Sequence, residues 1–257
     1  MLQPVVAFVG NAAIGLTGLL AIWHLLSMTL SSNPQLAAFT DMAPTAALMA
    51  LGAMAADKTL AVHMGASLGR IAAGLAIAAV LGLVTGLLIG LIGRLQRITY
   101  MPFQLLRMIS PLAWMPIAVI AFDTWNGAII FIITAAAVWP IVYSVSGAVR
   151  KLNPEWLELA DNLGASRLQK IRDFVLPATA QDLFSGLRLA LGISWVVLVP
   201  AELLGVTSGL GYALNDARDA LEYDRLAAMV LAIGIIGMIL DSLAMLLVRR
   251  WSWRATS

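Results

Sequence analysis

Six apolar runs dominate this chain, and each is long enough to cross a lipid bilayer as a helix. The hydrocarbon core is about 30 Å thick and needs roughly 20 apolar residues. The runs lie near residues 5–30, 67–93, 102–122, 125–148, 179–205 and 227–248. Hydrophobic residues make up 61% of the 257 residues and charged residues 12%, whereas soluble domains average about 45–50% and about 25%. We predict an all-α polytopic membrane protein with about six transmembrane helices, in which residues 1–257 form a single transmembrane domain.

The segment between the first two runs, residues 32–62, is more polar. It carries Asn33, Pro34, Asp41, Pro44, Asp57 and Lys58 around a weakly apolar stretch at 46–55. That stretch is too short to cross the hydrocarbon core. We therefore expect a short helix that lies outside the bilayer, and not a seventh span.

Basic residues in the connections set the orientation, because Lys and Arg collect on the cytoplasmic side of membrane proteins. The connections 93–101, 149–178 and 249–257 hold ten of them: Arg94, Arg97, Arg150, Lys151, Arg167, Lys170, Arg172, Arg249, Arg250 and Arg254. The opposite connections hold three, Lys58, Arg218 and Arg225. We expect both termini and the 149–178 connection in the cytoplasm, with 206–226 outside.

Glycines recur along the second run, where Gly82, Gly86, Gly90 and Gly93 are four, four and three residues apart. These intervals put small residues on one face of a helix and let a neighbouring helix approach closely. Ordinary helix packing explains this pattern better than a functional role does.

The longest polar interval runs from Asn153 to Pro177. Asn153 is a favourable N-cap, and Pro154 suits the first position of a helix. Gly164 offers this helix a left-handed stop. We therefore predict a short amphipathic helix on the cytoplasmic face.

A second helix is predicted directly after it. Ser166 with Gln169 three residues later forms the pattern of a capping box. Leu176 and Pro177 follow, and we expect the second helix to end there. The local pattern leaves open an alternative, an amphipathic helix pair that only lies on lipid.

The interval resembles a signature of ABC importer permeases, written E-A-A, three residues, G, nine residues, I-x-L-P. Here it reads Glu158-Leu159-Ala160, Gly164, then Phe174, Leu176 and Pro177. Leu159 and Phe174 depart from the family pattern conservatively. The resemblance implies that the 153–177 loop is the coupling helix region that meets a cytoplasmic ATPase. It assigns the coupling to Glu158, Ala160, Gly164, Leu176 and Pro177.

Further stretches are similar to one branch of these permeases, the importers of nitrate, sulfonates, taurine and bicarbonate. They are residues 67–70, the proline-rich stretch 105–116, and 186–211 with its Ala201-Glu202-Leu203-Leu204-Gly205 run. The resemblance implies the type I ABC importer fold and leaves the solute open within this group. It also implies a location in the bacterial cytoplasmic (inner) membrane.

The same resemblance implies the partners. They are two ATP-binding subunits, a second permease copy, which a homodimer would supply, and an extracytoplasmic substrate-binding protein. ATP and Mg²⁺ then belong to the ATPase subunits, and no cofactor is expected on this chain. The alternative that we retain is a secondary transporter or channel that needs no ATPase.

Other chemistry finds little support in the sequence. The phosphate-binding pattern G-x-x-x-x-G-K-[ST] is absent, so we expect no ATPase activity of the chain itself. Residues 65–69 match G-x-S-x-G, but a hydrolase elbow needs a strand before it and a helix after it. The chain has no cysteine and only two histidines, His24 and His63, so we expect no metal site. A net charge of +2 without a basic patch also argues against nucleic-acid binding.

Charged residues inside spans are costly and need a partner, a cavity or a route to the interface. They are Arg70, Arg107, Arg188, Glu202 and Asp241. Arg70 and Arg107 lie near span ends, where long side chains can reach the interface. Arg188 lies deeper, at about 10 Å for seven residues of helix.

We expect the translocation pathway to include Arg188, Arg107 and Glu202, together with Trp114 of the proline-rich third span. For Arg188 an equal alternative stands. Its side chain reaches lipid phosphate or pairs with Asp182.

Overall fold

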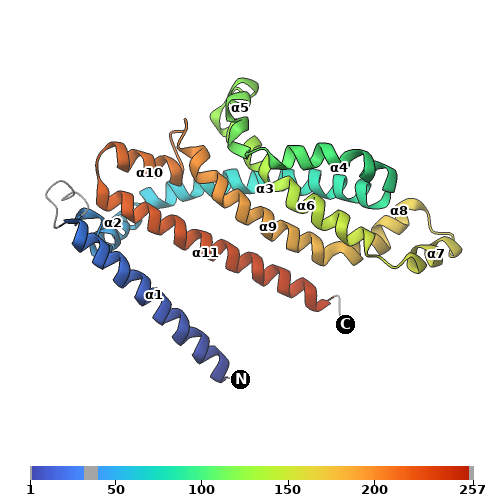
Figure 1. The fold of residues 1–257 in the computed structure, drawn as a ribbon, viewed down its shortest axis with the longest axis horizontal. Coiled ribbons are helices and arrows are strands. Elements are labelled where there is room, and N and C mark those ends of the chain that lie inside the picture. Colours follow the sequence, from blue (N-terminus) through green and yellow to red (C-terminus); the bar gives the residue numbers. More distant parts are fainter. Residues whose placement is uncertain (1, 32–39, 255–257) are drawn as a thin grey trace.

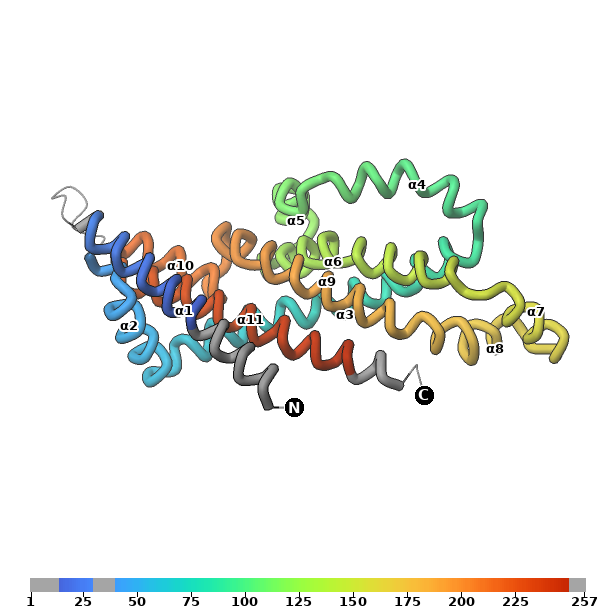
Figure 2. The backbone as a smooth tube through the Cα atoms, turned by 60° about the horizontal axis from the view of Figure 1, so that its bottom comes forward, coloured from blue at the N-terminus to red at the C-terminus, as the bar shows by residue number. Residues whose placement is uncertain are grey.

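The computed structural model describes residues 2–31 and 40–254, and every regular element in these ranges is a helix or a helical turn (Figure 1). This confirms the all-α prediction. The long helices run along the molecule, with the α7 and α8 region at one end and α2 and α10 at the other (Figures 1 and 2). The helices are α1 (Leu2–Ser31), α2 (Pro44–Ala56), α3 (Thr59–Leu91), α4 (Gly93–Met108), α5 (Met115–Ala121), α6 (Trp125–Arg150), α7 (Pro154–Asn162), α8 (Arg167–Gln169), α9 (Leu176–Glu202), α10 (Leu210–Asp219) and α11 (Tyr223–Arg254).

Helices α3 and α6 share the most extensive contact among the described helices, and they run in the same direction. A Cβ atom added to Gly74 would lie 2.6 Å from Cγ2 of Ile133, and one added to Gly90 would lie 2.7 Å from Cβ of Val149. These two contacts are sixteen residues apart on each helix, so the helices are parallel. Glycine at these positions lets the two backbones approach closely. The predicted glycine face is confirmed, except that a Cβ on Gly93 would meet nothing within 4 Å.

The parallel packing of α3 and α6 requires the segment between them to return along the whole bundle. Helix α4 and helix α5 make this return, joined by a 3-10 turn at Pro111–Trp114, and the pair is bent by 89°. Our prediction of one span at 102–122 is therefore wrong in two respects. Helix α4 begins at Gly93, so the basic stretch 93–101 is helical. The helix then breaks before Pro111, which cannot donate a backbone hydrogen bond.

Helix α9 is the C-terminal part of a longer continuous helix, called the 167–202 rod below. Residues 167–202 form one continuous helical stretch of 36 residues, of which Lys170–Val175 is a π-helical turn. We expected a helix end at Leu176 and Pro177, and this is wrong. Pro177 is in the first turn of α9, where the wider turn before it accommodates the missing backbone donor. The rod connects the α7 end of the molecule with the α10 end (Figure 2).

The described residues contain four helices that are long and apolar enough to cross a membrane, or five with the bent pair. The four are α3, α6, the 167–202 rod and α11. The first predicted span coincides with α1. The predicted short helix between the first two runs is α2, of 13 residues. Helix α3 begins at Thr59, before the predicted start at 67, and His63 in its added turns accepts a hydrogen bond from Gly209 at the start of α10.

The apolar core lies where α3, α6 and α9 meet. Ile129, Ile133 and Leu198 are completely buried there, and Ile141 and Val145 continue the core toward the α7 end. A separate cluster joins α2, α10 and α11. Helix α4 contributes no buried side chain, and Figure 2 shows it standing apart from α6.

Candidate functional site

The loop between α6 and α9 folds through local caps, as its sequence predicts. The side chain of Asn153 accepts a hydrogen bond from the backbone N–H of Glu155 at 3.1 Å. Gly164 ends α7 with φ of +72°. The N–H groups of Gly164 and Ala165 donate to the carbonyls of Asp161 and Ala160, at 2.9 Å each. This is the Schellman arrangement, in which a left-handed residue closes the helix.

The second half of the loop begins with the predicted capping box. The N–H of Ser166 donates to the side chain of Gln169 at 2.8 Å, and the N–H of Gln169 donates to the Ser166 hydroxyl at 3.4 Å. Lys170 forms an ion pair with Asp161 across the turn. These contacts hold α7 and α8 as one unit at the end of the 167–202 rod.

The residues assigned to coupling occupy two parts of this region. Glu158 and Gly164 lie on the exposed surface of the loop, whereas Ala160 is completely buried. Leu176 and Pro177 lie at the start of α9. Four large apolar side chains of the loop are more than half exposed: Trp156, Leu159, Leu163 and Leu168. Exposed apolar groups at the tip of a molecule indicate a contact with another protein or a membrane surface.

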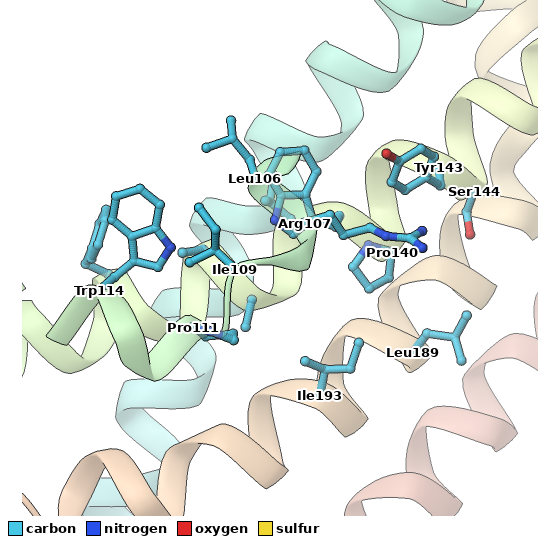
Figure 3. Close-up of a pocket in the computed structure, with 15 residues that line it drawn as sticks. Leu106, Arg107, Ile109, Pro111, Trp114, Pro140, Tyr143, Ser144, Leu189 and Ile193 are labelled. Carbon is cyan, nitrogen blue, oxygen red and sulfur yellow. The ribbon is translucent and has the colours of Figure 1, made fainter. Parts of the chain in front are cut away.

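A cavity of about 630 Å³ lies between α4, the Pro111–Trp114 turn, α6 and α9. Two of the residues assigned to the pathway, Arg107 and Trp114, line it, and Tyr143, Leu189 and Ile193 close its other sides (Figure 3). The walls are mainly apolar and aromatic. Arg107 is the charged member of the lining, which contains no carboxylate.

Arg107 points toward α6 in this cavity (Figure 3). Its guanidinium carbon lies 5.1 Å from the centre of the Tyr143 ring, a distance that gives a favourable cation–π contact. Among the described residues it forms no ion pair. The cavity therefore carries an uncompensated positive charge.

Arg188 is placed differently from Arg107. Its Nε and Nη2 atoms each lie 2.9 Å from a carboxylate oxygen of Asp241 on α11. The pair borders a groove of about 690 Å³ between α9 and α11. The alternative that paired Arg188 with Asp182 is therefore wrong about the partner, because the ion pair crosses to another helix.

Glu202 does not line the cavity of Arg107, because its side chain is buried at the α10 end of the bundle. It forms an ion pair with Arg70 and accepts hydrogen bonds from the Ser67 hydroxyl at 2.9 Å. Arg70 is only 5% exposed, so our expectation that it reaches the interface is wrong. The G-x-S-x-G match lies inside α3, where Ser67 serves this network and not a hydrolase elbow.

Sequence reasoning missed this network because its members are far apart in the chain. Arg70 and Glu202 are separated by 132 positions. The available signal was the cost of two unpaired opposite charges within predicted spans. That cost indicates that partners exist without saying which residues pair.

The helical bundle, its capped terminal loop and the cavity between its spans define a multi-pass membrane permease. A family model described as the inner membrane component of binding-protein-dependent transport systems matches residues 78–253. The chain belongs to this family, and it is a permease of the nitrate, sulfonate, taurine and bicarbonate branch of ABC importers. Permeases of this family are transmembrane subunits and not themselves the ATPase.

Similar proteins agree with this assignment. The bicarbonate transport system permease protein CmpB of Synechococcus elongatus is 35% identical over 93% of this chain and 88% of its own length. The nitrate import permease protein NrtB of Leptolyngbya laminosa is 34% identical over 73% of this chain and 67% of its own. The taurine transport system permease protein TauC of Escherichia coli K12 is 34% identical over 72% and 67%.

A solved structure of the MetNI methionine ABC transporter, described as inward facing, has the same fold. Its TM-score is 0.57 at 17% identity, and the match covers 72% of this chain and 94% of that one. Together with the family match, this identifies the type I ABC importer fold.

Proposed function

We propose that this chain is the permease subunit of an ATP-driven importer for a small anion such as bicarbonate, nitrate or a sulfonate. The observation that carries the proposal is the cavity between α4, α6 and α9, in which Arg107 is charged and no carboxylate is present. Relatives named for bicarbonate, nitrate and taurine transport support the same substrate range.

The chemistry of the cavity favours an oxyanion over a cation. A guanidinium is planar and offers paired N–H donors that match the oxygens of a flat anion. Apolar walls around it reduce screening and strengthen the attraction. The cation–π contact with Tyr143 holds the guanidinium without neutralising its charge. We therefore assign the pathway to Arg107 and Trp114, since the charges of Arg188 and Glu202 are already paired.

We further propose that α7 and α8 couple this pathway to two ATPase subunits that bind ATP and Mg²⁺. The exposed side chains of Trp156, Leu159 and Leu163 supply an apolar contact face for such a partner. The start of the 167–202 rod is tied to α7 by the ion pair of Lys170 with Asp161, so a displacement of the loop would pass directly into a helix that lines the cavity.

Two faces of this subunit favour a contact with a second copy of the chain. Helix α4 has no buried side chain, and the ion pair of Arg188 and Asp241 is half exposed at a depth where lipid is a poor solvent for charge. We propose that a homodimer covers these faces and that the two cavities join into one path. An extracytoplasmic binding protein would deliver the anion to it.

The test is reconstitution of the chain with the ATPase and binding protein of its own transport system. Proteoliposomes are loaded with MgATP, and uptake of labelled bicarbonate, nitrate and taurine is measured. We expect uptake of at least one anion that requires both partners, with an ATPase variant lacking its phosphate-binding lysine as control. Uptake by the permease alone, driven by an ion gradient, would instead establish a secondary transporter or channel.

A further inference from the structure

The first turn of α10 is held by side chains from other helices. The N–H of Gly209 donates to Nδ1 of His63 at 3.2 Å, and the N–H of Leu210 donates to the Ser67 hydroxyl at 2.8 Å. The N–H of Gly211 donates to the Glu202 carboxylate at 2.9 Å. Helix α10 has no side-chain cap of its own. Residues of α3 and α9 therefore satisfy the N–H groups that a helix leaves unpaired at its start.

Arg70 extends this cluster to two more segments. Its guanidinium pairs with Glu202 and donates to the carbonyl and the hydroxyl of Ser208, at 2.7 and 3.0 Å. It also donates to the side chain of Asn126 on α6 at 2.7 Å. The outer ends of α3, α6 and α9 and the start of α10 thus share one hydrogen-bonded network.

The backbone at this position has little freedom. Gly209 has φ of +118°, and a Cβ there would overlap Glu202 and Arg70. A Cβ on Gly211 would overlap the backbone of α9 at Val199. The connection from α9 to α10 is therefore fixed by backbone shape and by the buried ion pair together.

We propose that Ser67, Arg70 and Glu202 are positioning residues that join α10 rigidly to α9, so that the outer face and the coupling loop move together. Helix α9 continues without a break to the α8 end, and α10 begins only eight positions after Glu202. The exposed side of α10 carries Asp216, Arg218 and Asp219. We expect a binding protein to contact this surface. This inference rests on the proposed function, because it supplies the route by which docking outside changes ATPase activity inside.

The contacts of Ser67, Arg70 and Glu202 between α9 and α10 are called the joint below. Three variants of the assembled complex test it. Ser67→Ala removes one hydroxyl and leaves the ion pair intact, so it is the milder change. Glu202→Gln keeps the shape of the side chain and removes its charge. Thr134→Val is the matched control, because the Thr134 hydroxyl also makes a buried contact between helices, to the carbonyl of Gly74 at 3.2 Å, but lies outside the joint.

The first measurement is amide hydrogen exchange in α10. Loss of one N-cap interaction is expected to speed exchange in its first turn by roughly fivefold in Ser67→Ala, and more in Glu202→Gln, while Thr134→Val leaves it as in the parent. If exchange in both joint variants matches the parent, the side chains do not fix α10 and the inference is wrong.

The second measurement is the ATPase rate with and without the binding protein, loaded in turn with bicarbonate, nitrate and taurine. We expect the ratio of stimulated to basal rate to fall toward one in both joint variants and to stay parental in Thr134→Val. A parental ratio in a variant whose α10 has loosened would overturn the transmission role. If the parent complex itself is never stimulated, the proposed importer function fails, whereas amide exchange still reports on the joint.

Discussion

Arg188 on α9 and Asp241 on α11 form a two-point ion pair, with Nε and Nη2 of the arginine each 2.9 Å from one carboxylate oxygen. The pair joins two spans and compensates both charges. From the sequence, Arg188 was expected to lie deeper in its span than Arg107, but the pairing leaves Arg107 as the arginine whose charge is available to an anion.

The pairing predicts that replacement of Arg188 reduces the amount of assembled protein. Arg188→Gln leaves Asp241 without its partner inside a span, where an unpaired carboxylate is unfavourable. We expect several-fold less permease in the membrane. The double variant Arg188→Gln with Asp241→Asn removes both charges and should restore the level. Parental amounts of the single variant, measured by quantitative immunoblot, would contradict a structural role for the pair.

The contact between α3 and α6 predicts a strong effect of the smallest possible substitution. Gly86→Ala puts a Cβ 2.8 Å from Cβ of Val145 and 3.0 Å from the carbonyl of Val142. Overpacking of this kind costs about 1–3 kcal/mol. We expect a lower melting temperature for the purified protein, with Gly147→Ala as control because its Cβ meets nothing within 4 Å. Equal melting temperatures would show that the two helices can separate without cost.

The turn between α7 and α8 gives a test of backbone conformation alone. Gly164 has φ of +72° and free space around it, so Gly164→Ala adds conformational strain of about 1–2 kcal/mol without a clash. Gly164→Asn is the matched control, because asparagine tolerates the left-handed region. We expect anion uptake to fall in the alanine variant and to be largely kept in the asparagine variant, at equal membrane levels. Equal uptake by both variants would argue against a coupling role for this turn.

Orientation in the membrane remains a prediction from ten basic residues on one side and three on the other. The chain has no cysteine, so single cysteines can be introduced without background. Thr207, after α9, and Asn162, at the end of α7, are both exposed. A cysteine at Thr207 should react with an impermeant thiol reagent added to intact cells, and one at Asn162 only after lysis. The opposite labelling pattern would reverse the topology.

Sequence reasoning succeeded where the controlling contacts are local. Asn153, Gly164 and Ser166 act on residues no more than five positions away, so their roles can be predicted from the pattern alone. Sequence reasoning failed where tertiary packing determines whether a helix continues. Pro177 is typical of a helix end, yet the helix continues through it because neighbouring positions such as Val175 and Thr179 are buried in the bundle.

The candidate site shows the same division. The sequence indicated charged residues within spans, including Arg107 and Arg188. Which of them is paired depends on contacts such as that of Arg188 with Asp241, 53 positions away, and on the bend before Pro111 that turns α4 over the cavity. Neither the ion pair nor the bend can be predicted from composition or from the hydrophobic periodicity.

We propose that Arg107 supplies the positive charge that an anion meets in the pathway, and this role can be measured as anion uptake per assembled complex. Arg107→Gln, Arg107→Lys and the control Arg97→Gln, which removes a charge from the same helix outside the cavity lining, are compared in proteoliposomes with both partners and MgATP. We predict a loss of at least about tenfold for Arg107→Gln, equivalent to about 1.4 kcal/mol. Arg107→Lys should lose less, and Arg97→Gln should match the parent. Uptake by Arg107→Gln at the parental rate per complex would show that the anion does not meet this charge.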